Sequence, residues 1–171
     1  MDRRPTDPAS FATHEVHNQP PPLEDVNLFE SDRVLAETVV REGGGAARER
    51  LAAFGARVGS AETLELGRRA NRWPPELRAF DRFGHRCDQV EFHPAYHQLM
   101  ALSVAEGLHA ASWDHLAEGL DAEPRPGAIV ERCAGTYLMT QAEAGHGCPV
   151  TMTHAAIPAL RYQPSLAREW I

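Results

Sequence analysis

The chain has 171 residues, 43% of them hydrophobic and 24% charged, a composition typical of one soluble globular domain. All 17 basic residues are arginine, which excludes a Schiff-base lysine and a P-loop lysine. The net charge of −7, without a dense arginine stripe, argues against DNA binding by this segment, and no apolar run reaches the ~20 residues of a membrane helix.

The N-terminal segment has no helical periodicity. We expect residues 1–13 to form a disordered tail, and residues 14–30, with Pro20 to Pro22, to form an extended arm. Apolar side chains predict that this arm docks on the domain from about His14, through Val16, Leu23, Val26, Leu28 and Phe29. The N-terminus lacks the apolar stretch of a secretory signal, so we expect a cytoplasmic protein.

Three helices are predicted next. The first is capped by Ser31 or Asp32 and runs to about Arg41; the second spans 46–58, and the third, capped by Ser60, ends near Asn71. The spacing of apolar residues places these side chains inward: Val34, Leu35, Thr38 and Val39, then Leu51, Phe54 and Val58, then Leu64 and Ala70. The triplet at 43–45 lacks the G-x-G-x-x-G arrangement of a nucleotide loop.

Two prolines after Trp73 end the third helix, residues 81–84 predict a turn, and 89–92 predict a short strand. His93-Pro94 then opens a long helix that continues to about Leu108. Further helices are expected over 127–144, over 151–161 and from Ser165 onward. On the first of these the apolar pattern comprises Ile129, Val130, Cys133, Tyr137 and Met139. The sequence therefore predicts a mainly α domain over 14–171 with a short β-hairpin or strand.

Candidate chemistry is sparse. His93 and His97 share a helical face, but without a third ligand we favour a helix cap at His93 and a packing role for His97 over a metal site. His146 and His154 bracket Cys148, which permits a Cys/His nucleophile pair but supplies no orienting group.

Other polar residues have equally plain interpretations. Thr151 and Thr153 begin a predicted helix, where they either cap it or leave N–H groups for an anion. We expect Glu118, Glu131 and Glu143 on solvated faces, and the three cysteines, Cys87, Cys133 and Cys148, as reduced thiols in the core.

Several long segments carry a family resemblance: HNQPPPLEDVNLFESD, GSAETLELGRRAN, PPEL, FHPAYHQLM and CPVTMTHAAIPAL, in that order from His17 to Leu160. They resemble the acyl-CoA dehydrogenase superfamily, and specifically its AidB-type branch from the bacterial adaptive response to DNA alkylation. The resemblance covers the N-terminal helical domain only, from about Thr13 to Ile171.

The resemblance implies a larger protein, an FAD-containing homotetramer whose β-domain and C-terminal bundle would follow this chain. Flavin binding, the catalytic carboxylate that removes the substrate α-proton, and DNA binding belong to those regions, so no catalytic or cofactor-binding residue is carried over. The whole protein would oxidise an acyl thioester at its α,β-bond or protect DNA. The cleft-side candidates in this chain are Thr151, Met152, Thr153, Tyr96 and His97.

Two functions from different classes follow. The chain is either the N-terminal domain of such a flavoprotein, inactive and without FAD on its own, or a non-catalytic module for oligomerisation or partner docking. No metal is expected in either case.

Overall fold

The computed structural model describes residues 13–15 and 17–171. The predicted disordered tail lies outside them, apart from Thr13. Helices form most of the structure and two strands form one hairpin, which confirms the predicted mainly α fold. The elements are α1 (Leu28–Ser31), α2 (Arg33–Arg41), η2 (Gly45–Ala47), α3 (Arg48–Val58), α4 (Ala61–Arg72), β1 (Glu76–Phe80), β2 (Arg86–Glu91), α5 (Pro94–Ala105), η3 (Ala111–Ala117), α6 (Ala128–Ala142), α7 (Gly147–Leu160) and α8 (Pro164–Trp170).

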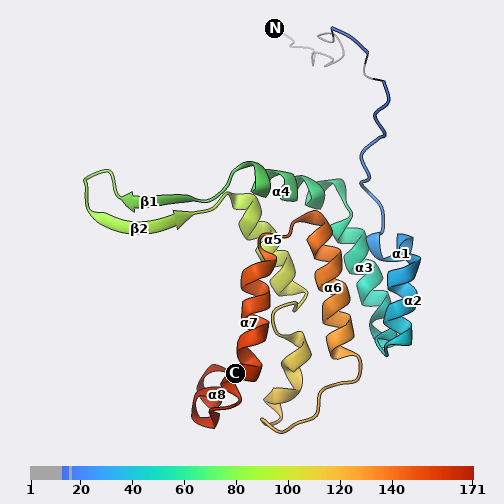
Figure 1. Cartoon of the computed structure of the whole chain (residues 1–171), viewed down its shortest axis with the longest axis vertical. Coiled ribbons are helices and arrows are strands. Elements are labelled where there is room, and N and C mark those ends of the chain that lie inside the picture. The colour runs from blue at the N-terminus through green and yellow to red at the C-terminus, as the bar shows by residue number, and fades with distance from the viewer. Residues whose placement is uncertain (1–12, 16) are drawn as a thin grey trace, which may run out of the picture.

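The helices pack around one apolar core. In Figure 1, α2, α3, α6, α5 and α7 stand roughly side by side, while α4 crosses one end of them. The most deeply buried side chains of this apolar core come from five helices and include Phe29, Val39, Leu51, Val58, Leu99 and Leu138. Within the described residues, no helix combines the length and apolar character that crossing a bilayer requires.

Helix starts follow the predicted capping chemistry. Asp32 accepts a hydrogen bond from the Leu35 N–H at 2.9 Å, and Ser60 accepts one from the Thr63 N–H at 3.2 Å. His93 Nδ1 accepts from the Ala95 N–H at 3.1 Å, with Pro94 in the first helical position. These contacts satisfy N–H groups that have no partner inside the helix.

Several predicted buried faces are wrong. Val34 is 75% exposed, and α6 turns Ile129, Cys133 and Tyr137 outward. Instead, α6 buries Ala128, Ala134 and Gly135 beside Leu138. These small residues let neighbouring segments of the same chain approach closely. A Cβ added at Gly135, for example, would lie 2.7 Å from the Leu108 side chain.

The N-terminal arm reaches the helices later than predicted. Residues 13–15 and 17–23 are exposed, Leu23 at 77%, and Val16 lies outside the described residues. Contact with the core begins near Val26, and Leu28 and Phe29 are buried. Asn27 fixes this point, because its side chain caps α1 and donates to the Ala52 carbonyl at 3.0 Å.

The hairpin projects from the helical body (Figure 1). Glu76 pairs with Glu91, Leu77 with Val90, Arg78 with Gln89 and Phe80 with Arg86, in antiparallel register. Because the second strand advances by one extra residue between Gln89 and Arg86, β2 contains a bulge, where Asp88 has a φ of 45°. The predicted turn at 81–84 is confirmed, and the strand that pattern analysis missed is β1.

Helix lengths differ from prediction at two places. Gly107, with a φ of 75°, ends α5 before Leu108, and the chain then forms η3. The helix predicted from Thr151 begins four residues earlier, at Gly147, since Pro149 is accepted in the first turn, where helix N–H groups need no internal partner.

Candidate functional site

A cleft of about 290 Å³ lies where the hairpin meets the helices. Its walls come from the end of α4, the Trp73-Pro74-Pro75 segment, the start of α5 and the turn before α7. Trp73 stacks on His93 with ring centroids 4.9 Å apart, and Phe92 stacks on Tyr96 at 4.2 Å. The Trp73–His93 stack therefore joins the two ends of the hairpin at the cleft.

Tyr96 and His97 occupy this end of α5 in different ways. Tyr96 lines the cleft, where burial, with smaller effects of Glu143 and Cys148, raises the pKa of its phenol. His97 is exposed, and its ring packs edge-on against Phe92 and Tyr96. Of these two residues, only Tyr96 belongs to the cleft.

Thr151, Met152 and Thr153 lie on the exposed side of α7, with Met152 at 64% exposure. They stand in the second turn of the helix, so the predicted capping role and the anion site are both wrong: the free N–H groups belong to the first turn. Thr153 Oγ1 donates to the Pro149 carbonyl at 3.0 Å, four residues earlier.

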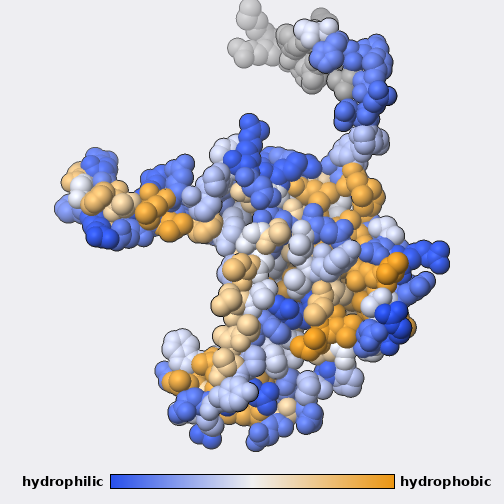
Figure 2. Space-filling model, viewed as in Figure 1, coloured by the Kyte–Doolittle hydropathy of each residue, from blue (hydrophilic) through white to orange (hydrophobic). Residues whose placement is uncertain are grey.

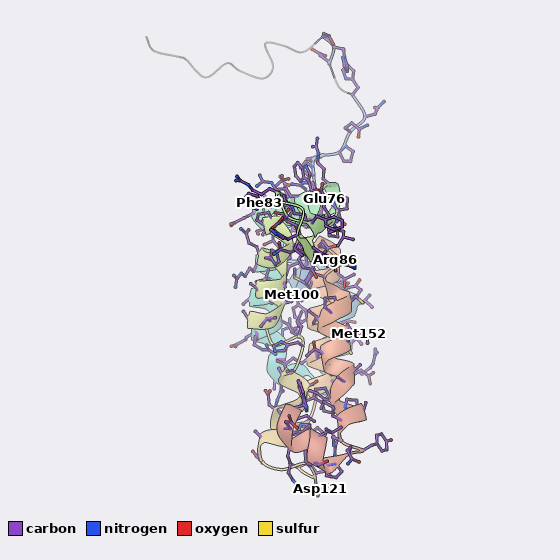
Figure 3. All side chains as sticks on the ribbon, turned by 90° about the vertical axis from the view of Figure 1, so that its left-hand side faces the viewer. Glu76, Phe83, Arg86, Met100, Asp121 and Met152 are labelled. Atoms are coloured by element: carbon purple, nitrogen blue, oxygen red, sulfur yellow. The ribbon has the colours of Figure 1, made fainter. Side chains whose placement is uncertain are left out.

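These positions belong to one open face. In Figure 3, α5 with Met100 and α7 with Met152 run side by side, and the hairpin and α8 stand at their two ends. Figure 2 shows hydrophobic residues along α7, on α8 and on the hairpin. The face defined by α5 and α7, here called the α5–α7 face, exposes Val104 and Met152, and α8 at its end exposes Leu166, Trp170 and Ile171.

A second feature is a buried chain of three polar side chains behind the cleft. Ser103 Oγ lies 2.8 Å from His146 Nε2, and His146 Nδ1 lies 2.6 Å from Glu143 Oε2. Ser103 and His146 are each 1% exposed and Glu143 is 6% exposed, so Glu143 is not on the solvated face that we predicted. The order serine, histidine, carboxylate matches a hydrolytic triad, but a sealed serine cannot reach a substrate. The trio joins α5 to the turn before α7.

Glu143 is held as a carboxylate in this turn. Burial is the largest influence and acts to raise its pKa, but hydrogen bonds from the His146 N–H, the imidazole and the Gly145 N–H outweigh it and lower the pKa. Sequence reasoning missed this residue, because a glutamate at the end of a helix is usually exposed. The local sequence did contain a signal for its burial: in the turn that follows Glu143, the N–H groups of Gly145 and His146 donate to its carboxylate.

The Cys/His nucleophile pair that the sequence permits at Cys148, but that we did not favour, does not form. His146 is engaged by Ser103 and Glu143, while His154 Nε2 lies 2.8 Å from Ser112 Oγ and its ring lies beside Trp113. Cys148, Cys87 and Cys133 are exposed, so the prediction of core cysteines is also wrong. All three lie on faces that the helical packing or the hairpin leaves open.

A network of charges crosses the other end of the bundle. Glu131, 5% exposed, accepts from Arg125 at 2.5 Å and contacts Arg50, which also reaches Glu106 at 2.6 Å. Burial raises the pKa of Glu106, an effect that Arg50 and Arg57 oppose. Glu131 therefore was wrongly predicted as solvated, whereas Glu118 is exposed as expected.

Side chains that could bind a metal ion are the last group of candidate site residues. Across the described residues, no three His, Cys, Asp or Glu side chains converge in a way that could hold an ion. His93 Nδ1 is used by the α5 cap, which confirms the capping role.

Comparison with solved structures supports the fold. ACDH-11 of Caenorhabditis elegans, solved in complex with C11-CoA, superposes with a TM-score of 0.69 at 20% identity, over 95% of this chain and 28% of that one. The apo form of Bd2924 superposes with a TM-score of 0.66 at 24% identity, over 81% of this chain and 27% of that one. At these identities the likeness concerns the fold.

Sequence comparison goes further. AidB of Escherichia coli (strain K12), which its name places with the acyl-CoA dehydrogenases, is 45% identical over 161 residues, or 94% of this chain. The match spans only 28% of the length of that protein. Residues 18–171 match the family described as Adaptive response protein AidB N-terminal domain. The chain therefore belongs to the AidB N-terminal domain family, with the mainly helical fold of the N-terminal region of acyl-CoA dehydrogenases.

Proposed function

We propose that this chain is the N-terminal helical part of an AidB-like, FAD-dependent protein of the DNA alkylation response, located in the cytoplasm. Its role is to provide one wall of an acyl cleft and a docking face for the rest of the protein. The observation that supports this most directly is the exposed α5–α7 face, with Met152 at 64% and Val104 at 45% exposure. Exposed apolar side chains gathered on one side of a domain are typical of an interaction site.

The five cleft-side candidates have different places in this proposal. Tyr96 lines the aromatic cleft and His97 lies beside it, while Thr151, Met152 and Thr153 stand on the open side of α7. The β-domain and C-terminal bundle of a longer chain would cover this face, and the assembled protein would form a homotetramer. Acyl thioester oxidation and DNA contact would belong to those parts.

We expect the flavin phosphates to bind in the β-domain rather than at the glycine triplet, residues 43–45, of this chain. The middle glycine of this triplet is packed: a Cβ added at Gly44 would lie 3.0 Å from Val130 and 3.1 Å from Val39. We therefore expect this chain to be colourless and inactive when purified.

A chimera tests the docking role. This chain would replace the matching N-terminal 28% of Escherichia coli AidB, and flavin absorbance and molar mass would be measured. We expect a soluble, flavin-containing oligomer, which Met152→Glu in the chimera should disrupt. Val34→Glu is the matched control, since Val34 is 75% exposed on α2, on the other side of the bundle. Equal effects of the two substitutions would contradict a docking role for the α5–α7 face.

The alternative is a non-catalytic module that self-associates or docks to a separate partner. The exposed hairpin favours it, because a two-stranded sheet in water is marginally stable alone. Flavin content separates the two: a chimera that never retains flavin, although it is folded, would favour the module.

A further inference from the structure

The hairpin has two strand edges, and they differ. The outer edge of β2 contains the bulge at Asp88, and bulges of this kind twist an edge away from pairing. The extra residue of this bulge lies in β2, and the β1 strand, ELRAF, contains neither a proline nor a positive φ. In Figure 1, β1 lies on the side of the hairpin that faces away from the helices below it. Among residues 13–15 and 17–171, no strand other than β2 pairs with β1, so its outer edge is open.

The two charged side chains of β1, Glu76 and Arg78, differ in whether they have an ion-pair partner. Glu76 lies directly opposite Glu91, a like-charged cross-strand pair that destabilises a hairpin. Arg78 contacts Glu91, whereas Glu76 has no ion-pair partner in residues 13–15 and 17–171. On the opposite face, Leu77 and Val90 are 67% and 53% exposed. The strand thus lacks a cation beside Glu76 and an apolar cover over Leu77.

We propose that β1 pairs antiparallel with β1 of a second copy of this chain, about a two-fold axis through Leu77. This register places Glu76 of each copy opposite Arg78 of the other and brings the two Leu77 side chains together. The neighbouring symmetric registers place Glu76 opposite Glu76 or Arg78 opposite Arg78. Like charges therefore disfavour both neighbours, and the sequence Glu-Leu-Arg is complementary to itself in one register only.

The contact creates a four-stranded sheet from two hairpins. Three or more strands with an apolar face are more stable than an isolated hairpin, and the joined face carries Leu77, Ala79 and Val90 from both copies. The buried area is that of two short strands, which predicts a weak, concentration-dependent dimer. This interface goes beyond the proposed function, because it needs neither flavin nor the α5–α7 face.

Charge reversal tests the register on the 171-residue chain by sedimentation equilibrium. Glu76→Arg and Arg78→Glu should each weaken dimerisation about tenfold, because two attractive contacts become repulsive. An equimolar mixture of the two variants should dimerise like the wild type, since every cross-strand contact between them is again of opposite sign. Glu37→Arg, an exposed reversal on α2, should leave the dimer unchanged.

Cross-linking tests the geometry in a background where the three native cysteines are serine. Leu77→Cys should give a disulfide-linked dimer on mild oxidation, because the two introduced thiols face each other on the axis. Ala79→Cys is the matched control: those thiols would stand about 14 Å apart along the strands, beyond disulfide reach. A chain that stays monomeric at all concentrations, or cross-linking equal for both variants, would overturn the proposal. So would a mixture of the two charge variants that fails to restore dimerisation.

Discussion

Ser103 Oγ lies 2.8 Å from His146 Nε2, in a contact that spans 43 residues of sequence and links α5 to the turn that starts α7. Both side chains are buried, so neither group can turn to water if its partner is removed. Removing the hydroxyl with Ser103→Ala should therefore destabilise the fold by about 1–3 kcal/mol. Urea unfolding measures this loss. The exposed Ser31→Ala serves as control, and an equal effect of both substitutions would contradict a specific role for the buried contact.

Glu143 should give the protein an acid-sensitive component of stability. Its folded-state pKa is below the ordinary value of 4.5, so the stabilisation from its carboxylate is fully present above that value and is lost as pH falls through the lower folded-state pKa. Glu143→Gln should be less stable than the wild type at neutral pH, and the difference should shrink as the pH is lowered. Unfolding free energies measured across this range check the trend, with the exposed Glu118→Gln as control. A difference that stays constant with pH would exclude this linkage.

Gly67 marks the closest approach of α4 to the end of α6. A Cβ at this position would lie 2.0 Å from the Ala142 carbonyl oxygen, a backbone atom that cannot move aside as a side chain can. Gly67→Ala should destabilise the fold by roughly 1–3 kcal/mol through overpacking. Gly147→Ala, in the first turn of α7, meets no atom within 4 Å and should be neutral or slightly stabilising. Thermal unfolding of the two variants distinguishes a steric effect from a general effect of replacing glycine.

Arg50, whose side chain is 45% exposed, connects the buried Glu131 with Glu106. Arg50→Met leaves the buried Glu131 with Arg125 alone, and we expect a loss of about 1–3 kcal/mol in the free energy of unfolding. Arg33→Met breaks an exposed pair with Glu37 and should cost less than about 1 kcal/mol. If raised salt reduced both losses equally, the Arg50 network would be no more protected from solvent than a surface pair.

Local signals predicted the starts of α2, α4 and α5 well. Asp32, Ser60 and His93 cap their helices because the chemistry lies within three residues of sequence. The hairpin turn at Asp81 was equally local: its carboxylate accepts from the Phe83 and His85 N–H groups.

Burial could not be predicted in the same way. Which face of α6 is buried depends on residues far away in the sequence. Glu131 can be buried because Arg50, from another helix, forms an ion pair with it. On α5 and α7 apolar residues lie all around the helix, so periodicity does not show which side stays open. The position of the cleft around Tyr96 depends on the Trp73–His93 stack, which joins residues on the two sides of the hairpin.

That same stack fixes where the hairpin joins the helical body. Pro74 and Pro75 restrict the chain entering β1, Pro94 restricts the chain leaving β2, and the rings of Trp73 and His93 stack across the two junctions with centroids 4.9 Å apart. The hairpin is therefore anchored at its base, whereas Phe83, in the turn at its other end, is exposed. We expect a partner that displaced the base to disturb Tyr96, because Phe92, the residue after β2, stacks on its ring.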